Sequence, residues 1–228
     1  LLFILSLVWM SFLACEKESG PDELGGNTNI ALTAVDSSSY ISGTYNGQSF
    51  SNSSLTVKSN KDGIVTYVAK IDISQFSNEL KLKALNSISQ LMEFYNFDTT
   101  GGVFALNNNE LTFEFKLKVT SEGYLDYFME GKPWVIGRYA DGVGTKYSIK
   151  NSKGETLTRE VTEKTGKDEW PLGFFLIKTS KIEQQAPADD PVIDKVIYRI
   201  YHKFGLVYVE YQLKDGTSLK LNVWAWFI

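Results

Sequence analysis

The sequence holds few of the side chains that enzymes most often use for nucleophilic or metal-assisted catalysis. Its 228 residues include one histidine, His202, and one cysteine, Cys15. A zinc site needs several His or Cys ligands, and a Cys–His nucleophile needs both residues in one site. Because His202 lies among strand-type residues in YRIYHKFG, we expect it to have a structural role at a sheet edge. The sequence therefore predicts no metal ion and no cofactor.

Carboxylates are the remaining catalytic candidates, because glycoside hydrolysis needs only two of them across a cleft. Most of the glutamates alternate with apolar residues, which is typical of the water-exposed face of a strand. The candidates by residue type are Glu114, Glu160, Glu163, Glu169 and Glu210. We expect solvated side chains here, and a hydrolase of extracellular polymer stays an alternative.

A second acidic group offers oxygen ligands of the kind that suit Ca²⁺. It consists of Asp189, Asp190 and Asp194. The spacing lacks the regularity of a calcium loop, so a solvated polar turn is the favoured interpretation.

Two tryptophans break the apolar–polar alternation of the last predicted strand, TSLKLNVWAWFI. Trp224 and Trp226 lie on the face where polar residues are expected. With Tyr208 diagonal to Trp224 across the preceding hairpin, they can form a platform that stacks on sugar rings or anchors a protein. The alternative is that a helix predicted at 78–94 covers this face. Trp170, which follows a charged turn in DEWPLGFF, is a further candidate ligand-binding residue.

The N-terminal residues 1–14, LLFILSLVWMSFLA, are apolar apart from two serines. They are too few to cross a hydrocarbon core as a helix, which takes about 20 residues. They are typical of the hydrophobic region of a secretory signal peptide. Because no methionine or basic region precedes them, we expect the printed sequence to begin inside this signal.

The stretch FLAC, at 12–15, resembles the lipobox of bacterial lipoproteins, with Phe12 where that pattern usually has Leu. The following EKES, at 16–19, is similar to the charged export signals of surface lipoproteins of the Bacteroidetes. The resemblance implies that Cys15 carries acyl chains, which anchor a domain to a bilayer without a spanning helix. It implies a lipid-anchored outer-membrane protein, either surface-exposed or facing the periplasm. An ordinary signal peptide with a coincidental cysteine is the alternative.

Residues 15–39 are rich in Gly, Ser, Asn and acidic side chains. Such a composition buries too little surface to offset its ordering entropy, so we expect a lipidated cysteine followed by a flexible tether. The remainder, 40–228, suits a single domain with a polar loop at 184–191. The 27 acidic and 23 basic side chains leave a net charge of -4. Without a basic stripe, nucleic acid is not expected as a partner.

Period-two alternation predicts a mainly β domain, an antiparallel sandwich or barrel built from hairpins. Three turns, at 61–63, 152–154 and 214–216, end in Gly. The last residue of a three-residue hairpin loop needs a positive φ, which Gly adopts without a Cβ clash. This loop length makes apolar residues oppose one another across each hairpin. The predicted pairs are Val57–Tyr67, Ile149–Leu157, Tyr211–Leu219 and, for opposite charges, Glu210–Lys220.

Two helices interrupt these strands in the prediction. Apolar residues fall on one face of 78–94, which is typical of an amphipathic helix packed on a sheet. A shorter helix is predicted at about 122–130, with Ser121 as N-cap and Pro133 barring its extension.

Together these features favour a lipid-anchored cell-envelope protein whose non-catalytic β domain binds a glycan, peptide or protein partner. A carboxylate-based hydrolase and a structural subunit of an envelope assembly are the alternatives.

Overall fold

The computed structural model describes residues 20, 22–95, 104–107 and 109–225. The predicted lipidation site Cys15 and the predicted ligand-binding residue Trp226 lie outside these ranges. The described elements, in chain order, are η1 (Ala31–Thr33), β1 (Ser38–Tyr45), β2 (Gln48–Lys61), β3 (Ile64–Asp72), α1 (Asn78–Phe94), β4 (Phe104–Asn107), β5 (Glu110–Thr120), β6 (Gly123–Asp126), β7 (Trp134–Arg138), β8 (Lys146–Lys150), β9 (Thr156–Lys164), β10 (Trp170–Leu172), β11 (Phe175–Ile177), β12 (Ser180–Gln185), β13 (Ile193–Tyr201), β14 (Gly205–Leu213) and β15 (Ser218–Ala225).

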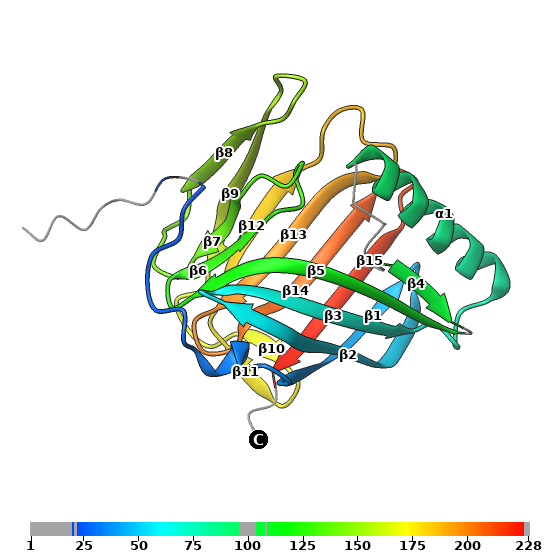
Figure 1. Ribbon diagram of the computed structural model, residues 1–228, viewed down its shortest axis with the longest axis horizontal. Helices are drawn as coiled ribbons and strands as arrows, with labels where there is room; N and C mark the ends of the chain where they lie inside the picture. The colour runs from blue at the N-terminus through cyan, green and yellow to red at the C-terminus, as the bar shows by residue number, and fades with distance from the viewer. Residues whose placement is uncertain (1–19, 21, 96–103, 108, 226–228) are drawn as a thin grey trace, which may run out of the picture.

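Within the described residues, 13 strands form one antiparallel sheet that is nearly closed into a barrel (Figure 1). The order is β7-β6-β5-β3-β2-β1-β15-β14-β13-β12-β9-β8, and β4 pairs with β5. The two end strands are joined by side chains, since the Trp134 indole donates to the Tyr147 carbonyl over 3.1 Å. The Tyr147 hydroxyl also accepts from the Arg138 backbone N–H over 3.1 Å. The predicted mainly β, antiparallel fold is confirmed.

Two of the three hairpins, β8–β9 and β14–β15, have the predicted three-residue loop. In the third, Lys61 of β2 pairs with Ile64 of β3, so the loop is the two residues Asp62-Gly63, and a β-bulge between Val57 and Ser59 restores the predicted pair Val57–Tyr67. Gly63, Gly154 and Gly216 have φ values of 82°, 83° and 82°, the left-handed conformation that the turns require. All four predicted cross-strand pairs are present, namely Val57–Tyr67, Ile149–Leu157, Tyr211–Leu219 and Glu210–Lys220.

The helix predicted at 78–94 is present as α1 and lies across one end of the barrel (Figure 1). Its N-terminus is capped by the Ser77 hydroxyl, which accepts from the Leu80 N–H over 3.2 Å. Leu80 is buried among side chains from the sheet. No helix in the described part of the chain combines the length and the apolar character needed to cross a membrane.

The short helix predicted at about 122–130 is wrong. Residues 123–126 form strand β6, which pairs with β5 on one side and β7 on the other. Every residue of β6 is buried. A Cβ on Gly123 would lie 2.1 Å from the Gly137 carbonyl oxygen, so this glycine lets β6 and β7 approach. Pairing on both edges outweighed the local helix signals at Ser121 and Pro133.

The end of the barrel opposite α1 is covered by residues 22–37, which the sequence analysis assigned to the tether. Leu24 is buried in the interior cluster. The Asn27 N–H donates to the Ser121 hydroxyl over 2.9 Å, and the Asn60 amide donates to the Thr33 carbonyl over 3.1 Å. The 3-10 turn η1 lies in this segment. The barrel thus has one end covered by its N-terminal segment and the other by α1.

The hairpin β10–β11 lies outside the barrel, on the outer face of β13, β14 and β15. It pairs only within itself among the described strands. Leu172 and Ile177 pack on Val207, with Trp170 and Trp224 at the margin. This hairpin, rather than α1, therefore covers the outer face that carries Trp224.

Candidate functional site

The interior of the barrel is not completely filled by its own side chains. A cavity of about 350 Å³ lies between the inner wall and α1. Phe113, Phe115 and Leu219 face this interior yet are only half-buried. Protein cores are normally close-packed, so half-buried side chains on the inner face indicate unfilled space. The volume lies in the range of small-molecule binding sites.

The lining of the cavity is mainly apolar. Strands contribute aromatic and branched side chains, and α1 contributes one row along its inner face. The strand residues include Tyr45, Phe50, Ile71, Phe113, Phe115 and Leu221, and the helix residues include Ala84, Ile88, Leu91 and Met92. Water gains few hydrogen bonds in such a space, and apolar cavities of this kind accept apolar guests.

One wall of the cavity is a row of aromatic rings around Phe115. Its ring is stacked on Phe113 and on Tyr67, each with a centroid distance of 5.6 Å. Phe128 adds a tilted contact at 5.9 Å. Because the rings support one another, this wall is a preformed surface for a planar or chain-like apolar molecule.

An ion pair lies at the floor of the cavity. The Arg159 guanidinium donates to the Asp126 carboxylate over 2.6 Å, to the Gln184 amide oxygen over 2.8 Å and to the Trp134 carbonyl over 2.9 Å. It also stacks on the Trp134 ring, 3.8 Å from the centroid. Both charged side chains are almost completely buried, with exposed fractions of 2% and 0%.

The charges around the cavity are balanced. Burial raises the pKa of Asp126, and the adjacent Arg159 opposes this shift. Burial also raises the pKa of Tyr198, which keeps this phenol neutral. The other charged lining residue in the described chain, Glu114, binds Lys58 over 2.6 Å. Among the described residues, the lining offers a charged ligand no unpaired counter-charge and so favours an uncharged ligand.

Helix α1 covers the cavity and is held by the buried Leu80 and by polar contacts at the rim. Lys83 forms an ion pair with Asp215 in the β14–β15 turn over 2.6 Å. Near the other end of the helix, the Tyr95 hydroxyl donates to Asp190 over 2.5 Å. These polar contacts leave the inner face of α1 free to line the cavity.

Three of the four predicted ligand-binding residues come together on the outer face of the sheet. The Trp170 and Tyr208 rings meet with centroids 5.4 Å apart. Trp224 is half-buried, donates to the Ser42 hydroxyl over 3.1 Å and packs beneath Gly173 of the β10–β11 hairpin. These rings support the hairpin, and Trp226 lies outside the described residues.

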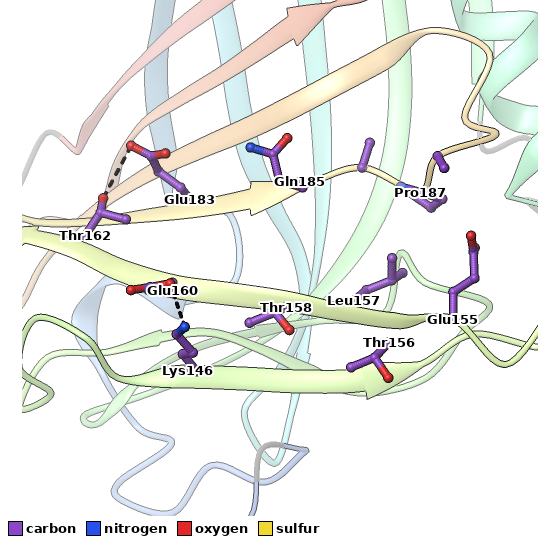
Figure 2. A pocket seen from close by; sticks show the side chains of 12 residues that line it. Lys146, Glu155, Thr156, Leu157, Thr158, Glu160, Thr162, Glu183, Gln185 and Pro187 are labelled. Atoms are coloured by element: carbon purple, nitrogen blue, oxygen red, sulfur yellow. Dashed lines mark hydrogen bonds and ion pairs between the residues drawn. The ribbon is translucent and has the colours of Figure 1, made fainter.

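The candidate carboxylates do not face one another across a cleft lined by rings. A groove of about 490 Å³ lies on the outer face of β8, β9 and β12. Glu160 and Glu183 line it from adjacent strands (Figure 2). Glu160 pairs with Lys146 over 3.2 Å, and Glu183 pairs with Lys181 and Lys195. No aromatic residue is among those lining this groove in the described chain. The groove therefore gives no support to a two-carboxylate hydrolase.

The other candidate acidic residues are mostly engaged in local contacts. Glu163 binds Arg199 through two hydrogen bonds of 3.0 Å. Glu210 accepts from the Tyr208 hydroxyl over 2.8 Å, and Glu114 binds Lys58 as described above. Glu169 stands at the start of the β10–β11 hairpin, where its backbone N–H donates to the Ile177 carbonyl.

The acidic group at 189–194 does not converge on one point. Asp189 binds Lys153. Asp190 is buried and accepts from the N–H groups of Val192 and Ile193. Asp194 is exposed. Among the described residues no cluster suited to hold a metal ion is found. His202 lies exposed in the β13–β14 turn, with its ring 4.6 Å from Tyr201.

Comparisons with models of protein families, with curated proteins and with solved structures found no match to this chain.

Neither the cavity nor the ion pair at its floor was predicted from the sequence. One signal for the pair was present in LTREV. Leu157, Arg159 and Val161 share one face of a strand, so the alternation places a charge on the apolar face. Such an arginine needs a buried partner.

Proposed function

We propose that this protein is a binding protein that holds an uncharged apolar small molecule inside its β barrel. The observation that carries the proposal is the cavity of about 350 Å³, with an aromatic wall around Phe115 and a charge-balanced floor at Arg159 and Asp126. Filling such a space with apolar atoms removes surface from water and supplies missing packing contacts. Helix α1 would exclude water from the occupied site.

A dye-binding experiment tests the proposed ligand class. The chain from Glu16 onward keeps every residue that the structure describes, and it can be titrated with the neutral solvatochromic dye Nile red. Dodecanol and dodecanoate are then compared as competitors. We expect dodecanol to displace the dye at a concentration about tenfold lower, because burying a carboxylate without a free counter-charge is costly. Equal or better competition by dodecanoate would contradict the uncharged ligand, and a failure of Nile red to bind would contradict the cavity site.

Lipid anchoring at Cys15 is the second part of the proposal. It is supported by the resemblance of FLAC to a lipobox, and it would hold the barrel at the outer membrane, on either the outer or the periplasmic side. We expect Cys15→Ala in the full chain to abolish labelling by a fatty-acid probe in a Gram-negative host. A Cys15→Ala chain that still incorporates the probe would rule out this anchor.

A further inference from the structure

The turn of the β10–β11 hairpin exposes a continuous apolar tip. Phe174 is fully exposed, and Phe175 and Leu176 are 67% and 58% exposed. Pro171, which pairs with Leu176, is exposed as well. Single exposed apolar residues are common, whereas several large adjacent ones indicate contact with another apolar surface or phase.

The opposite side of the hairpin is firmly seated. Leu172 and Ile177 are buried against Val207. A Cβ on Gly173 would lie 2.4 Å from the Trp224 ring, so the turn is pressed against that tryptophan. The turn is therefore fixed on the barrel wall through Gly173, while the side chains of Phe174 and Phe175 point into solvent.

The base of the hairpin is held by a second set of contacts. Arg199 stacks over Trp170, 3.9 Å from the ring centroid. The same guanidinium binds Glu163 of β9 through two hydrogen bonds of 3.0 Å. This arrangement ties the hairpin to the outer wall of the barrel.

The exposure and hydrogen bonding of the tip suit a bilayer. The exposed residues of the tip line neither the interior cavity nor the groove on β8, β9 and β12. Its two strands pair with each other from Trp170–Ile177 to Leu172–Phe175, which satisfies the peptide groups on their facing edges and lowers the cost of bringing the tip into an apolar phase. Lys178 ends the hairpin and Lys203 lies in the adjacent β13–β14 turn, both exposed, and the exposed Asp168 and Glu169 precede β10. The two lysines can contact anionic head groups.

The hairpin also lies at the end of the barrel where the N-terminal segment enters. It connects the end of β9 to the start of β12, at the end opposite α1 (Figure 1). The carbonyl of Gly20 accepts from Arg138 at the end of β7, at that same end. Five residues from Cys15 to Gly20 span at most about 18 Å. A lipid on Cys15 would therefore bring this end of the barrel toward the membrane, and this orientation rests on the proposed function.

We propose that the β10–β11 tip is a membrane-docking element that inserts Phe174, Phe175 and Leu176 into the head-group region of a bilayer. Together with a lipid on Cys15 it would give the barrel a second contact with the membrane. The end of the barrel that α1 covers would then face away from the bilayer.

Vesicle flotation tests this docking in the absence of the anchor. The chain from Glu16 onward lacks both Cys15 and the apolar residues 1–14. We expect it to float with phosphatidylcholine vesicles containing phosphatidylglycerol. The double variant Phe174→Ser, Phe175→Ser should bind at least about tenfold more weakly, because both rings lose their insertion. Leu82→Ser is the matched control, since Leu82 is 63% exposed on α1 at the other end of the barrel, and it should float like the parent chain.

Flotation that is unchanged in the double variant, or no flotation of the parent chain, would overturn the proposal. So would a dimer in vesicle-free buffer that the double variant loses, because the tip would then dock on a second copy. Nile red binding separates this proposal from the cavity site. The double variant should retain dye binding inside the barrel whatever its behaviour on vesicles.

A site-specific label provides an independent readout. The chain from Glu16 onward has no cysteine, so Phe174→Cys and Leu82→Cys can each carry one environment-sensitive NBD group. We expect added vesicles to shift the NBD emission to the blue at 174 and to leave it unchanged at 82. Equal responses at both positions would show that the tip has no special contact with lipid.

Discussion

The Asp126 carboxylate and the Arg159 guanidinium form an ion pair of 2.6 Å inside the barrel. Arg159 is on β9 and Asp126 ends β6, so the pair bridges two strands on opposite sides of the seam between β7 and β8. The guanidinium also donates to the Trp134 carbonyl of β7. One buried pair therefore contributes both to barrel closure and to the cavity floor.

Removing one member of this pair should be strongly destabilising. We expect Asp126→Ala to lower the free energy of unfolding by about 3–5 kcal/mol, because it leaves the Arg159 charge buried without a counter-charge. The double variant Asp126→Leu, Arg159→Met should lose less, since no unpaired charge remains. Urea unfolding of the three chains measures both effects. A loss below about 1 kcal/mol in Asp126→Ala would show that water reaches Arg159 and that the floor is open.

Acid should destabilise the protein through two surface carboxylates. Hydrogen bonds from Lys132 and Ser152 lower the pKa of Glu130 to about 2. Those from Lys83 and Thr217 lower the pKa of Asp215 to about 2. In the unfolded chain such groups titrate near pH 4, so the unfolded state binds these protons first as the pH falls. Their stabilisation is present above about pH 4–5 and is lost on the way to pH 2.

The measurement is the urea midpoint as a function of pH. We expect the midpoint to fall between about pH 5 and pH 2, by a modest amount because solvent screens both groups. The fall should be smaller in Glu130→Gln, which cannot take up the proton. An identical pH profile for Glu130→Gln would show that Glu130 does not contribute.

The close pairing of β1 with β15 depends on Gly43. A Cβ at this position would lie 2.0 Å from the Lys220 carbonyl oxygen, so Gly43→Ala must push the two strands apart. We expect a loss of about 3 kcal/mol of unfolding free energy. Gly142→Ala is the matched control, because a Cβ there meets no atom within 4 Å, and it should stay within about 0.5 kcal/mol of the parent. Similar urea midpoints for both variants would mean that β1 and β15 are not held this closely.

Local patterns predicted the elements whose structure is decided locally. The Lys214-Asp215-Gly216 loop and the alternation on either side of it were enough to place Tyr211 opposite Leu219. The apolar face of 78–94 likewise gave α1 at its observed bounds. In both cases turn chemistry or periodicity agrees with the tertiary structure.

The features that the sequence did not predict depend on contacts between distant segments. Helix signals flank residues 123–126 in the sequence, yet these residues form strand β6 because they pair with β5 and β7. Trp224 breaks the strand alternation because the β10–β11 hairpin packs over it. The cavity exists because the barrel encloses more space than Phe115 and its neighbours fill. Alternation in the sequence identifies the inner face of each strand but does not give the radius of the barrel.

A pair of tryptophan substitutions on α1 tests the internal binding site most directly. Ala84 lines the cavity, whereas Leu82 on the same helix is 63% exposed. We expect Ala84→Trp to fill the cavity and to weaken Nile red binding by about tenfold or more, and Leu82→Trp to leave the binding unchanged. Both chains should keep the parent's circular dichroism spectrum. If Ala84→Trp binds the dye as tightly as Leu82→Trp, the apolar molecule does not bind inside the barrel.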